Sequence, residues 1–398
     1  MKFIDLGLDE RILEGIDAMG YENATPVQEQ VMVPVLEGRD IIAAAQTGTG
    51  KTAAFLLPLL HRLITTPHHA GDINAMIIVP TRELAIQIAE SIEGLSYFTD
   101  VSSIAVYGGG DGNSFAIEKK ALTTGVDIVV CTPGRMIAHL NMGYVKLKGL
   151  RYLVLDEADR MLDMGFSEDL AKIITFLPKQ RQNLLFSATM PTKMRELARK
   201  LLTNPVEINI AISKASENIT QKAFVVYEAQ KDAIIKDMLS SKKYTKVIVF
   251  CSKKQSVKKL SADLRRAHFS VAEVHSDLEQ KEREQALQDF KNLKISVIVA
   301  TDILSRGIDI DDIDLVINYD VPNDGEDYIH RIGRTARAAS LGTAFTLIGE
   351  KEQNKFASIE ALLGTPVQKG NVPEEFGPTP IYAPKSGAAG KRKFYKKR

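Results

Sequence analysis

Cysteine and long apolar runs are scarce in this sequence. Its 398 residues include 2 cysteines, Cys131 and Cys251, and each ends an apolar run of β type. A disulfide framework or a zinc site needs more thiols at closer spacings, so we expect both to be reduced and buried. No apolar run approaches the roughly 20 residues of a membrane-spanning helix, so we expect no membrane association. Residues 1–5 contain an acid with no apolar run behind them, so we expect no secretory signal and a cytoplasmic location.

The sequence also lacks an excess of charge of either sign. Lys and Arg number 51 and Asp and Glu number 50, which gives a formal net charge of +1. Binding to nucleic acid would therefore have to come from local patches, not from the field of the whole molecule. One such patch ends the chain, because residues 385–398 include 7 Lys and Arg and no Asp or Glu. This segment is either a nucleic-acid anchor or a solvated stretch that aids solubility.

Two long regions of the chain alternate apolar runs with helical patterns. The runs occupy residues 40–43, 75–79, 127–130, 152–155 and 184–186 in the first region and 247–250, 297–300, 315–317 and 344–347 in the second. Continuously apolar runs indicate strands of a parallel sheet buried on both faces. Amphipathic stretches such as 83–95 and 256–267 lie between them. Strand and helix therefore alternate as in a doubly wound α/β fold.

The length and the pattern predict two domains. A polar stretch at 213–218 follows the first region, and we place domain 1 at 1–208, a linker at 209–219 and domain 2 at 220–363. Beyond domain 2 the apolar pattern stops and prolines and glycines become frequent. Residues 364–398 are therefore predicted to form a flexible basic tail.

A glycine-rich loop follows the first apolar run and precedes a helical pattern. Its sequence is Ala45-Gln46-Thr47-Gly48-Thr49-Gly50-Lys51-Thr52, a variant of the phosphate-loop pattern with Ala in place of the first Gly. Gly48 and Gly50 allow backbone N–H groups to turn toward phosphate oxygens, and the helix adds its positive N-terminal dipole. Lys51 can reach the β- and γ-phosphates of ATP, and the Thr52 hydroxyl can ligate Mg²⁺. The alternative is a glycine-rich turn without a ligand, which the strand–loop–helix context disfavours.

Two carboxylates end the apolar run at 152–155. Asp156 is placed to hold Mg²⁺, largely through water, and Glu157 can act as the general base that polarises an attacking water. An acidic strand end by itself is more often a solvated turn or a helix cap. Together with the phosphate loop, these acids favour hydrolysis of a γ-phosphate.

The residues Asp156-Glu157-Ala158-Asp159 spell the signature of the DEAD-box family of ATP-dependent RNA helicases. The chain resembles that family, and its short-tailed bacterial members in particular, from about Phe3 to about Leu363. The resemblance implies two tandem RecA-like domains and an RNA-stimulated ATPase that converts ATP and water to ADP and phosphate. It also implies binding of ATP and single-stranded RNA across both domains, local unwinding of short RNA duplexes without sequence preference, and release of RNA on hydrolysis. A monomer is expected, with partners from ribosome precursors or RNA decay.

The resemblance assigns further nucleotide contacts in domain 1. Gln28 matches the family's adenine-reading glutamine, because an amide offers a donor and an acceptor together. Tyr21 matches the residue that packs on the adenine ring, and Phe3 matches an isolated upstream aromatic. Ser187 and Thr189, in a Ser-Ala-Thr tripeptide, match the motif that couples the acidic loop to domain closure.

Three segments of domain 1 match the RNA-facing motifs of the family, and all offer Thr hydroxyls, loop N–H groups or Arg side chains suited to a sugar–phosphate backbone. They are Pro80-Thr81-Arg82, Gly108-Gly109 and Thr132-Pro133-Gly134-Arg135. Thr81 is also a good helix N-cap, and Pro133-Gly134 is also a good turn, so we expect both roles at once.

Domain 2 contributes a second set of matches. The residues that match RNA-contacting motifs are Gln280, Arg283, Thr301 and Asp302, and the nucleotide-facing matches are Gly307 and Asp309. The sequence departs from the family pattern at Ser276, where Gly is common, and at Ser305, where Ala is usual.

Arg334 and Arg337 match the arginine fingers of the family, which reach the γ-phosphate. They lie three residues apart and would face the same way on a helix. Arginine suits this role because its charge is permanent and its fork matches phosphate oxygens. Ala336 stands where Gly is preferred. Without the other motifs, the segment would be interpreted as a solvated basic helix face.

Three other functions fit parts of the sequence. A non-unwinding, ATP-gated RNA clamp, or a scaffold that remodels RNA–protein complexes, shares every motif with a helicase. A DNA-directed motor would differ only in its response to the 2′-OH of RNA. An unrelated phosphate-loop enzyme is disfavoured by the ordered motifs that span both domains.

Overall fold

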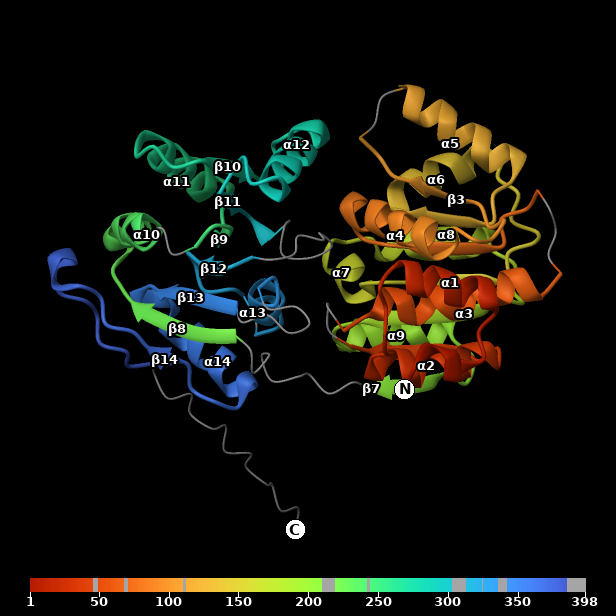
Figure 1. Ribbon diagram of the computed structural model, residues 1–398, viewed down its shortest axis with the longest axis horizontal. Helices are drawn as coiled ribbons and strands as arrows, with labels where there is room; N and C mark the ends of the chain where they lie inside the picture. Colours follow the sequence, from red (N-terminus) through yellow and green to blue (C-terminus); the bar gives the residue numbers. More distant parts are fainter. Residues whose placement is uncertain are drawn as a thin grey trace, which may run out of the picture. The chain divides into compact units, whose positions relative to one another are not determined.

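The computed structural model describes residues 1–45, 49–67, 71–109, 112–209, 219–241, 244–302, 313–323, 325–335 and 342–384. These residues form two compact units, one ending at residue 209 and the other beginning at residue 219 (Figure 1). The predicted linker at 209–219 lies almost wholly outside the described residues, so its bounds stay a prediction.

The first unit is built on a parallel sheet that has seven strands among the described residues. The strands are β1 (Ile41–Ala44), β2 (Ala75–Ile78), β3 (Ser103–Val106), β4 (Ile128–Cys131), β5 (Tyr152–Leu155), β6 (Gln182–Ser187) and β7 (Val206–Asn209). They lie in the order β3-β4-β2-β5-β6-β1-β7. The glycine-rich loop and the acidic strand end therefore follow β1 and β5, which flank β6 on either side.

Helices cover both faces of this sheet. They are α1 (Glu10–Ala18), α2 (Pro26–Leu36), α3 (Lys51–Thr65), α4 (Arg82–Leu95), α5 (Gly112–Thr124), α6 (Pro133–Asn141), α7 (Ala158–Asp163), α8 (Ser167–Phe176) and α9 (Thr192–Leu201), after a 3₁₀ helix at Phe3–Leu6. Side chains of α1–α4 and of alternate strand residues such as Ile41 and Ile77 form one core. Side chains of α5–α9 form the other core with Ile42, Met76 and Ile78. The alternation follows from the two-residue period of a strand, which sends successive side chains to opposite faces.

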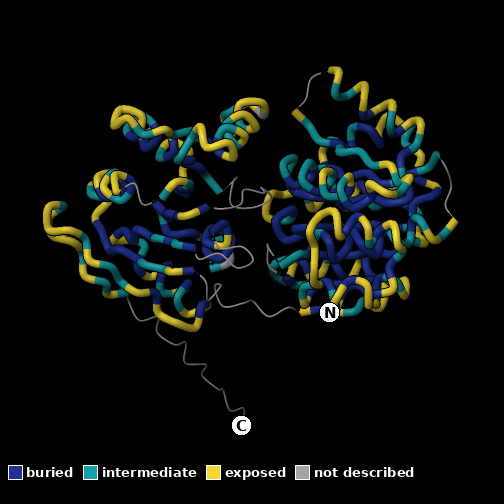
Figure 2. Tube along the Cα trace, in the orientation of Figure 1, coloured by how far each residue is buried: buried dark blue, intermediate teal, exposed yellow. Residues whose placement is uncertain are grey.

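The second unit repeats this plan. Its strands are β8 (Ile219–Val225), β9 (Val247–Phe250), β10 (Val271–Val274), β11 (Val297–Ala300), β12 (Leu315–Asn318), β13 (Gly342–Ile348) and β14 (Gln368–Lys369), in the order β10-β11-β9-β12-β13-β8-β14. Its helices are α10 (Lys231–Ser240), α11 (Lys254–Arg266), α12 (Gln280–Lys291), α13 (Gly325–Ile332) and α14 (Gln353–Leu363), with 3₁₀ helices at Glu228–Gln230, Glu350–Glu352 and Glu374–Phe376. Helices α10 and α11 pack on one face, and α13 and α14 on the other. Figure 2 shows buried strands inside each unit and exposed outer helix faces.

These two sheets confirm the predicted doubly wound α/β class, and every predicted apolar run overlaps a strand. The strands β3, β7, β8, β10 and β14 were not among the runs given above. Strands β3, β10 and β14 lie at sheet edges, where one side of a strand is solvated and polar residues are tolerated. Cys131 and Cys251 are buried free thiols, as expected. No helix in the described part of the chain is long and apolar enough to cross a membrane.

The prediction of a flexible tail from residue 364 is wrong for residues 364–384, because they pack on the second unit. Strand β14 pairs in parallel with β8, Gln368 opposite Lys222. Phe376 and Tyr382 pack against the apolar cores of this unit. The prolines and glycines suggested disorder, but the apolar side chains between them bury enough surface to order the segment. Residues 385–398 lie outside the described residues.

Candidate functional site

The glycine-rich loop leads from β1 into α3, which begins at Lys51. Gly50 is the N-cap and has a φ of 88°, a left-handed conformation that favours glycine. A Cβ at this position would also lie 2.5 Å from Gln28 Nε2, so the end of the Gln28 side chain would have to shift. Lys51 is 5% exposed, and its Nζ has no hydrogen-bond partner among the described residues. A buried ammonium without a hydrogen-bond partner is unfavourable, so this position favours an anionic ligand that can accept its bonds.

The predicted adenine-reading segment is bonded to the same loop. The Thr25 N–H donates to Gln28 Oε1 at 2.8 Å, and Gln28 Nε2 donates to the Gly50 carbonyl at 3.1 Å. The Thr25 hydroxyl donates to the Thr49 carbonyl at 2.8 Å. Both ends of the Gln28 amide are therefore engaged within the protein. Each end keeps one further hydrogen-bonding position, a second N–H and a second lone pair, with which the amide could read an adenine edge.

Tyr21 and Phe3 lie close together but differ in exposure. Their ring centroids are 6.5 Å apart, and Tyr21 is 38% exposed while Phe3 belongs to the core. The exposed Tyr21 ring offers a surface on which a planar base could stack. Phe3 supports that ring from within.

The acidic residues occupy the carboxyl end of β5. The Glu157 N–H donates to Asp156 Oδ1 at 2.9 Å, and Glu157 itself has a φ of 48°. A glutamate in this region is strained, and such strain is concentrated at functional sites. Burial raises the pKa of Asp156 to about 6, although the positive charge of Lys51 opposes the rise. Glu157 Oε2 lies 3.6 Å from Arg160 Nη1 and accepts no hydrogen bond from the described residues.

Asp159, the last residue of the acidic motif, was not among the predicted site residues, but the fold places it between two of the predicted segments. Its Oδ2 accepts from the N–H groups of Ala188 at 3.2 Å and Thr189 at 3.1 Å, and from the Thr189 hydroxyl at 3.2 Å. The Ser187 hydroxyl donates to the Thr189 carbonyl at 2.6 Å. The loop after β5 and the loop after β6 are thus joined through one carboxylate. Its place in the motif was a signal that could have identified it.

The three predicted RNA-facing segments of the first unit follow the neighbouring strands β2, β4 and β3. Thr81 caps α4 by accepting from the Leu84 N–H at 3.3 Å, as predicted. Gly109 has a φ of 88°, and a Cβ there would lie 1.8 Å from Arg82 Nη1, so the Arg82 guanidinium lies against the glycine backbone. Because the carboxyl ends of parallel strands meet at one edge of the sheet, the segments share one surface.

The third segment starts a helix, and no tight turn forms there. Thr132 is the N-cap of α6 and Pro133 its first residue. A Cβ on Gly134 would meet nothing within 4 Å, so a ligand has room to approach this backbone. The Arg135 Nε donates to Glu118 Oε2 at 2.6 Å.

In the second unit, Asp302 already has a partner within the protein. The fully buried Arg331 donates through Nε to Asp302 Oδ1 at 2.6 Å and through Nη1 to Asn318 Oδ1 at 3.2 Å. Thr301 follows β11, and its N–H donates to the Val274 carbonyl at 3.2 Å. Thr301 and Asp302, which were predicted to contact RNA, are therefore fixed in position by hydrogen bonds within the protein.

The other predicted contacts of this unit lie on helices or beyond them. Gln280 and Arg283 stand at the start of α12. The helix-face argument for the arginine fingers is wrong at Arg334, because α13 ends at Ile332 and Arg334 lies in the following turn. The remaining predicted residues lie outside the described residues, and they are Gln46, Thr47, Gly48, Gly307, Asp309 and Arg337.

Comparisons with known proteins cover both units. Residues 25–197 match the family model described as DEAD/DEAH box helicase, and residues 230–339 match the helicase conserved C-terminal domain. The ATP-dependent RNA helicase CshA of Listeria monocytogenes is 42% identical over 360 residues, which cover 90% of this chain and 68% of that protein. The chain belongs to the DEAD-box family of ATP-dependent RNA helicases. It is an ATP-dependent enzyme, as the sequence motifs predicted.

Two solved structures of similar helicases show the same fold. S. cerevisiae Dbp5 bound to RNA and ADP BeF3 matches with a TM-score of 0.84 at 30% identity, covering 93% of this chain and 95% of that chain. Mss116p bound to ssRNA and AMP-PNP matches with a TM-score of 0.84 at 29% identity, covering 94% of this chain and 80% of that chain. The two sheets of the present helicase are tandem RecA-like domains.

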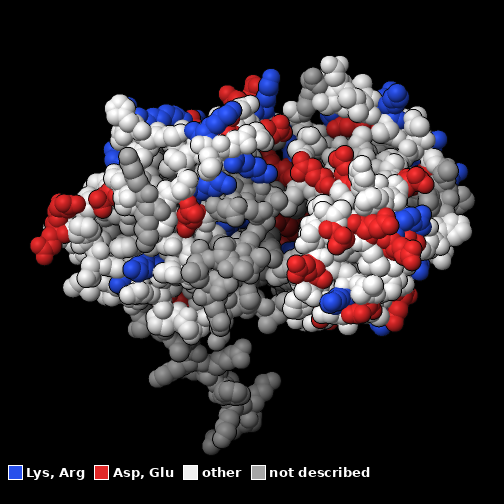
Figure 3. All heavy atoms as spheres, in the orientation of Figure 1, with Lys and Arg blue, Asp and Glu red and all other residues white. Residues whose placement is uncertain are grey.

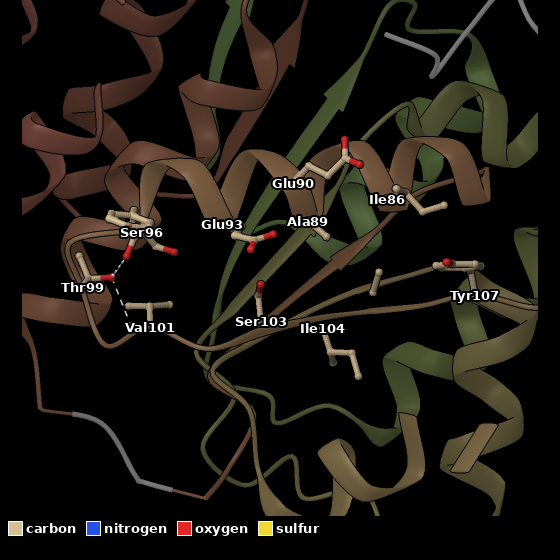
Figure 4. Close-up of a pocket in the computed structure, with 12 residues that line it drawn as sticks. Ile86, Ala89, Glu90, Glu93, Ser96, Thr99, Val101, Ser103, Ile104 and Tyr107 are labelled. Atoms are coloured by element: carbon tan, nitrogen blue, oxygen red, sulfur yellow. Dashed lines mark hydrogen bonds between the residues drawn. The ribbon is translucent and has the colours of Figure 1, made fainter. Parts of the chain in front are cut away.

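A separate hollow of this helicase, of about 620 Å³, lies between α4 and the edge strand β3 (Figure 4). Ile86, Ala89 and the carboxylates of Glu90 and Glu93 line its helical side. None of the predicted nucleotide-binding residues lines it. Tyr107, at one end, leads into the glycine pair that was predicted to face RNA.

Proposed function

We propose that this helicase hydrolyses ATP at the carboxyl edge of its first sheet, with Lys51 holding the β- and γ-phosphates. The observation that carries the proposal is the buried Lys51 ammonium, which has no partner among the described residues. Phosphate oxygens would supply its missing acceptors. Residues 46–50 would surround the phosphates with backbone N–H groups. Gln28 and Tyr21 would bind the adenine, with Phe3 behind Tyr21.

The residues also fit a magnesium ion. Thr52 offers a hydroxyl and Asp156 a carboxylate. Mg²⁺ suits such a sparse site because it keeps several waters and is held by one or two protein groups plus phosphate. The ion would neutralise charge on the transferred phosphoryl group. Glu157 would accept a proton from the attacking water, using the Oε2 atom that accepts no bond from the described residues.

The second domain would complete the nucleotide site with Gly307, Asp309 and the guanidinium groups of Arg334 and Arg337. The buried bonds of Arg331 to Asp302 and Asn318 support this proposal, because they fix the segment that leads into Arg334. Arginine fingers stabilise the charge of the transition state. Neither domain alone would hydrolyse ATP efficiently.

We infer that single-stranded RNA, or one strand of a short duplex, binds to the predicted segments of both domains. The RNA-bound Dbp5 and Mss116p structures, which resemble this chain in fold, support the inference. In domain 2 the contacts would come from Gln280, Arg283, Thr301 and Asp302. Contacts to the sugar–phosphate backbone read no sequence, so binding would be sequence-independent. Nucleotide and RNA would each favour the closed state for the other, and hydrolysis would release the RNA.

We also propose a cytoplasmic, monomeric protein that acts on ribosome precursors or decaying RNA. The two buried free thiols support a reducing compartment.

The proposed chemistry predicts that Lys51→Ala and Glu157→Gln each lower RNA-stimulated ATP hydrolysis by at least about 100-fold, because each removes a group that acts on the reacting phosphate or water. Steady-state ATPase rates at saturating RNA measure the effect. Glu93→Gln, an exposed carboxylate on α4, serves as the matched control and should behave as wild type. If the Glu157→Gln enzyme hydrolysed ATP at the wild-type rate, Glu157 would not be the general base.

Two further assays identify the nucleic-acid substrate and show whether ATP hydrolysis leads to unwinding. Stimulation by RNA but not by DNA of the same sequence is expected, because the 2′-OH distinguishes them. Displacement of a strand from a short RNA duplex should require ATP. Tight RNA binding with ATP but no displacement would identify a clamp that does not unwind.

A further inference from the structure

Helices α5 and α6 of the first domain meet through a cluster of five side chains that the nucleotide chemistry does not use. Phe115 and Glu118 lie one turn apart on α5, and Arg135 and His139 lie one turn apart on α6, so each pair shares a helix face. Tyr144 follows α6. Glu118 and His139 are buried, although both are polar.

Glu118 is the centre of this cluster. Its Oε2 accepts from Arg135 Nε at 2.6 Å and lies 2.8 Å from His139 Nε2. Its Oε1 accepts from the Tyr107 N–H at 3.4 Å. One buried carboxylate therefore contacts three segments: the residue after β3, the first turn of α6 and the last turn of α6.

The remaining aromatic residues fix the orientation of these groups. The Phe115 ring stacks on His139 with centroids 4.4 Å apart, and the Arg135 Cζ lies 4.6 Å from the same ring. The Tyr144 hydroxyl contacts His139 Nδ1. A tyrosine hydroxyl is protonated at neutral pH and can donate to Nδ1, and burial, followed by the charge of Glu118, raises the pKa of Tyr144 further. The imidazole can then carry its own proton on Nε2, which faces Glu118.

Two of the three contacted segments are the ones assigned to RNA. Tyr107 directly precedes Gly108-Gly109, and Arg135 ends the Thr132-Pro133-Gly134-Arg135 segment. The bond from Arg135 Nε to Glu118 Oε2 is 2.6 Å long. Arg135 Nη2 is buried and has no hydrogen-bond partner among the described residues, and 15% of the side chain is exposed. Glu118 thus holds the guanidinium in a fixed orientation, with a part of the side chain left at the surface.

We propose that Glu118 is a positioning residue for RNA binding: it holds Arg135 and the glycine pair in one fixed arrangement at the carboxyl edge of the sheet. This inference rests on the proposed RNA contact of Arg135. A buried ion pair is weak evidence for stability, because desolvation opposes its attraction. The pair of Glu118 and Arg135 would instead act in RNA recognition, because a single carboxylate orients two RNA-facing segments.

The test compares Glu118→Gln, Arg135→Ala and the double variant with wild type. The RNA concentration for half-maximal ATPase, kcat at saturating RNA, RNA-independent KM for ATP and the thermal unfolding midpoint are measured for each. Glutamine keeps an acceptor oxygen but removes the charge, so the fold is preserved while the pair weakens. Glu93→Gln controls for loss of a carboxylate elsewhere in the same domain.

Glu118→Gln is expected to raise the half-maximal RNA concentration about 3- to 30-fold, with kcat at saturating RNA and KM for ATP within about twofold of wild type. The double variant should bind RNA more weakly than Arg135→Ala by clearly less than the full effect of Glu118→Gln, because one of the two segments that Glu118 positions is already disabled. RNA binding by Arg135→Ala equal to wild type would contradict the proposed RNA contact itself. Three results would overturn the positioning role alone. They are fully additive effects of the two substitutions on the half-maximal RNA concentration, an unchanged half-maximal RNA concentration in Glu118→Gln, and a joint loss of kcat and ATP binding in Glu118→Gln.

Discussion

Asp156 illustrates how the chemistry of one residue depends on its surroundings. The carboxyl is buried at the end of β5, and burial raises its pKa to about 6. Lys51 offsets only part of this effect. Burial therefore disfavours the charged form of Asp156, and a bound cation would stabilise that form.

Asp156→Asn is predicted to increase the free energy of unfolding of the nucleotide-free, chelator-treated protein by about 1–3 kcal/mol above pH 6. A carboxyl with a raised pKa binds its proton more tightly when folded, so it lowers stability as pH rises from about 4 to about 6. The gain should therefore disappear near pH 4. Urea unfolding at pH 4, 6 and 8 measures it, and an equal gain at all three values would exclude the electrostatic cause. The variant should also lose ATPase activity.

Asp159 has a different task, because it accepts three bonds from Ala188 and Thr189. Asp159→Asn is predicted to lower the stimulation of ATPase by RNA about tenfold, while ATP binding without RNA stays near wild type. The reason is that the amide cannot accept all three bonds at one oxygen as strongly as a carboxylate. Fluorescent nucleotide titration and ATPase rates with and without RNA separate the two effects. A matching loss of nucleotide affinity would contradict this role.

At the scale of elements, residues 366–384 behave as part of the second domain. Glu360 of α14 accepts from the Val367 N–H at 2.8 Å, Lys369 Nζ at 2.6 Å and the Tyr382 hydroxyl at 2.6 Å. Burial alone would raise the pKa of Glu360, but these bonds outweigh it and lower that pKa. Gln353 adds bonds to the Ile381 carbonyl and the Ala383 N–H. The segment is thus tied to α14 at both ends.

Tyr382→Phe is predicted to lower the free energy of unfolding by about 1 kcal/mol at pH 7, because a partly buried carboxylate oxygen loses its donor. The effect should shrink as pH falls and Glu360 becomes protonated, since a carboxyl with a lowered pKa stabilises the fold above its usual pKa. Tyr97→Phe, at a 76% exposed tyrosine, is the control and should change nothing. Equal denaturation curves for Tyr382→Phe and wild type would show that the bond adds no stability.

At the scale of the whole molecule, charge is divided unevenly along the chain. The last 14 residues carry 7 basic and no acidic side chains, so residues 1–384 carry 44 basic and 50 acidic ones. Figure 3 shows many acids on one face of the first domain. Residues 1–384 therefore have no general attraction for RNA, and their binding relies on shaped local contacts.

Deleting residues 385–398 is predicted to weaken RNA binding and to reduce the slope of log affinity against log salt by up to about 5, because each lost phosphate contact removes roughly 0.7. ATPase at saturating RNA should survive. RNA binding measured from 50 to 300 mM salt tests this, with a full-length variant whose tail Lys and Arg are replaced by Ser as the control for length. An unchanged slope would identify the segment as a solvated stretch.

The sequence by itself determined most of the central strands of both sheets and indicated the glycine-rich loop, because continuous apolar runs and a glycine-rich turn leave few local alternatives. It also indicated Asp156 and Glu157 through their place at a strand end. Tertiary structure alone decided the bonds of Gln28 to the phosphate loop and of Asp159 to Thr189, since their partners are distant in the chain. It decided the order of residues 364–384 as well, because packing against α14 and β8 outweighs a local composition that favours disorder. The proposed role of Glu118 also depends on tertiary structure, because only the fold brings the three contacted segments to its carboxylate.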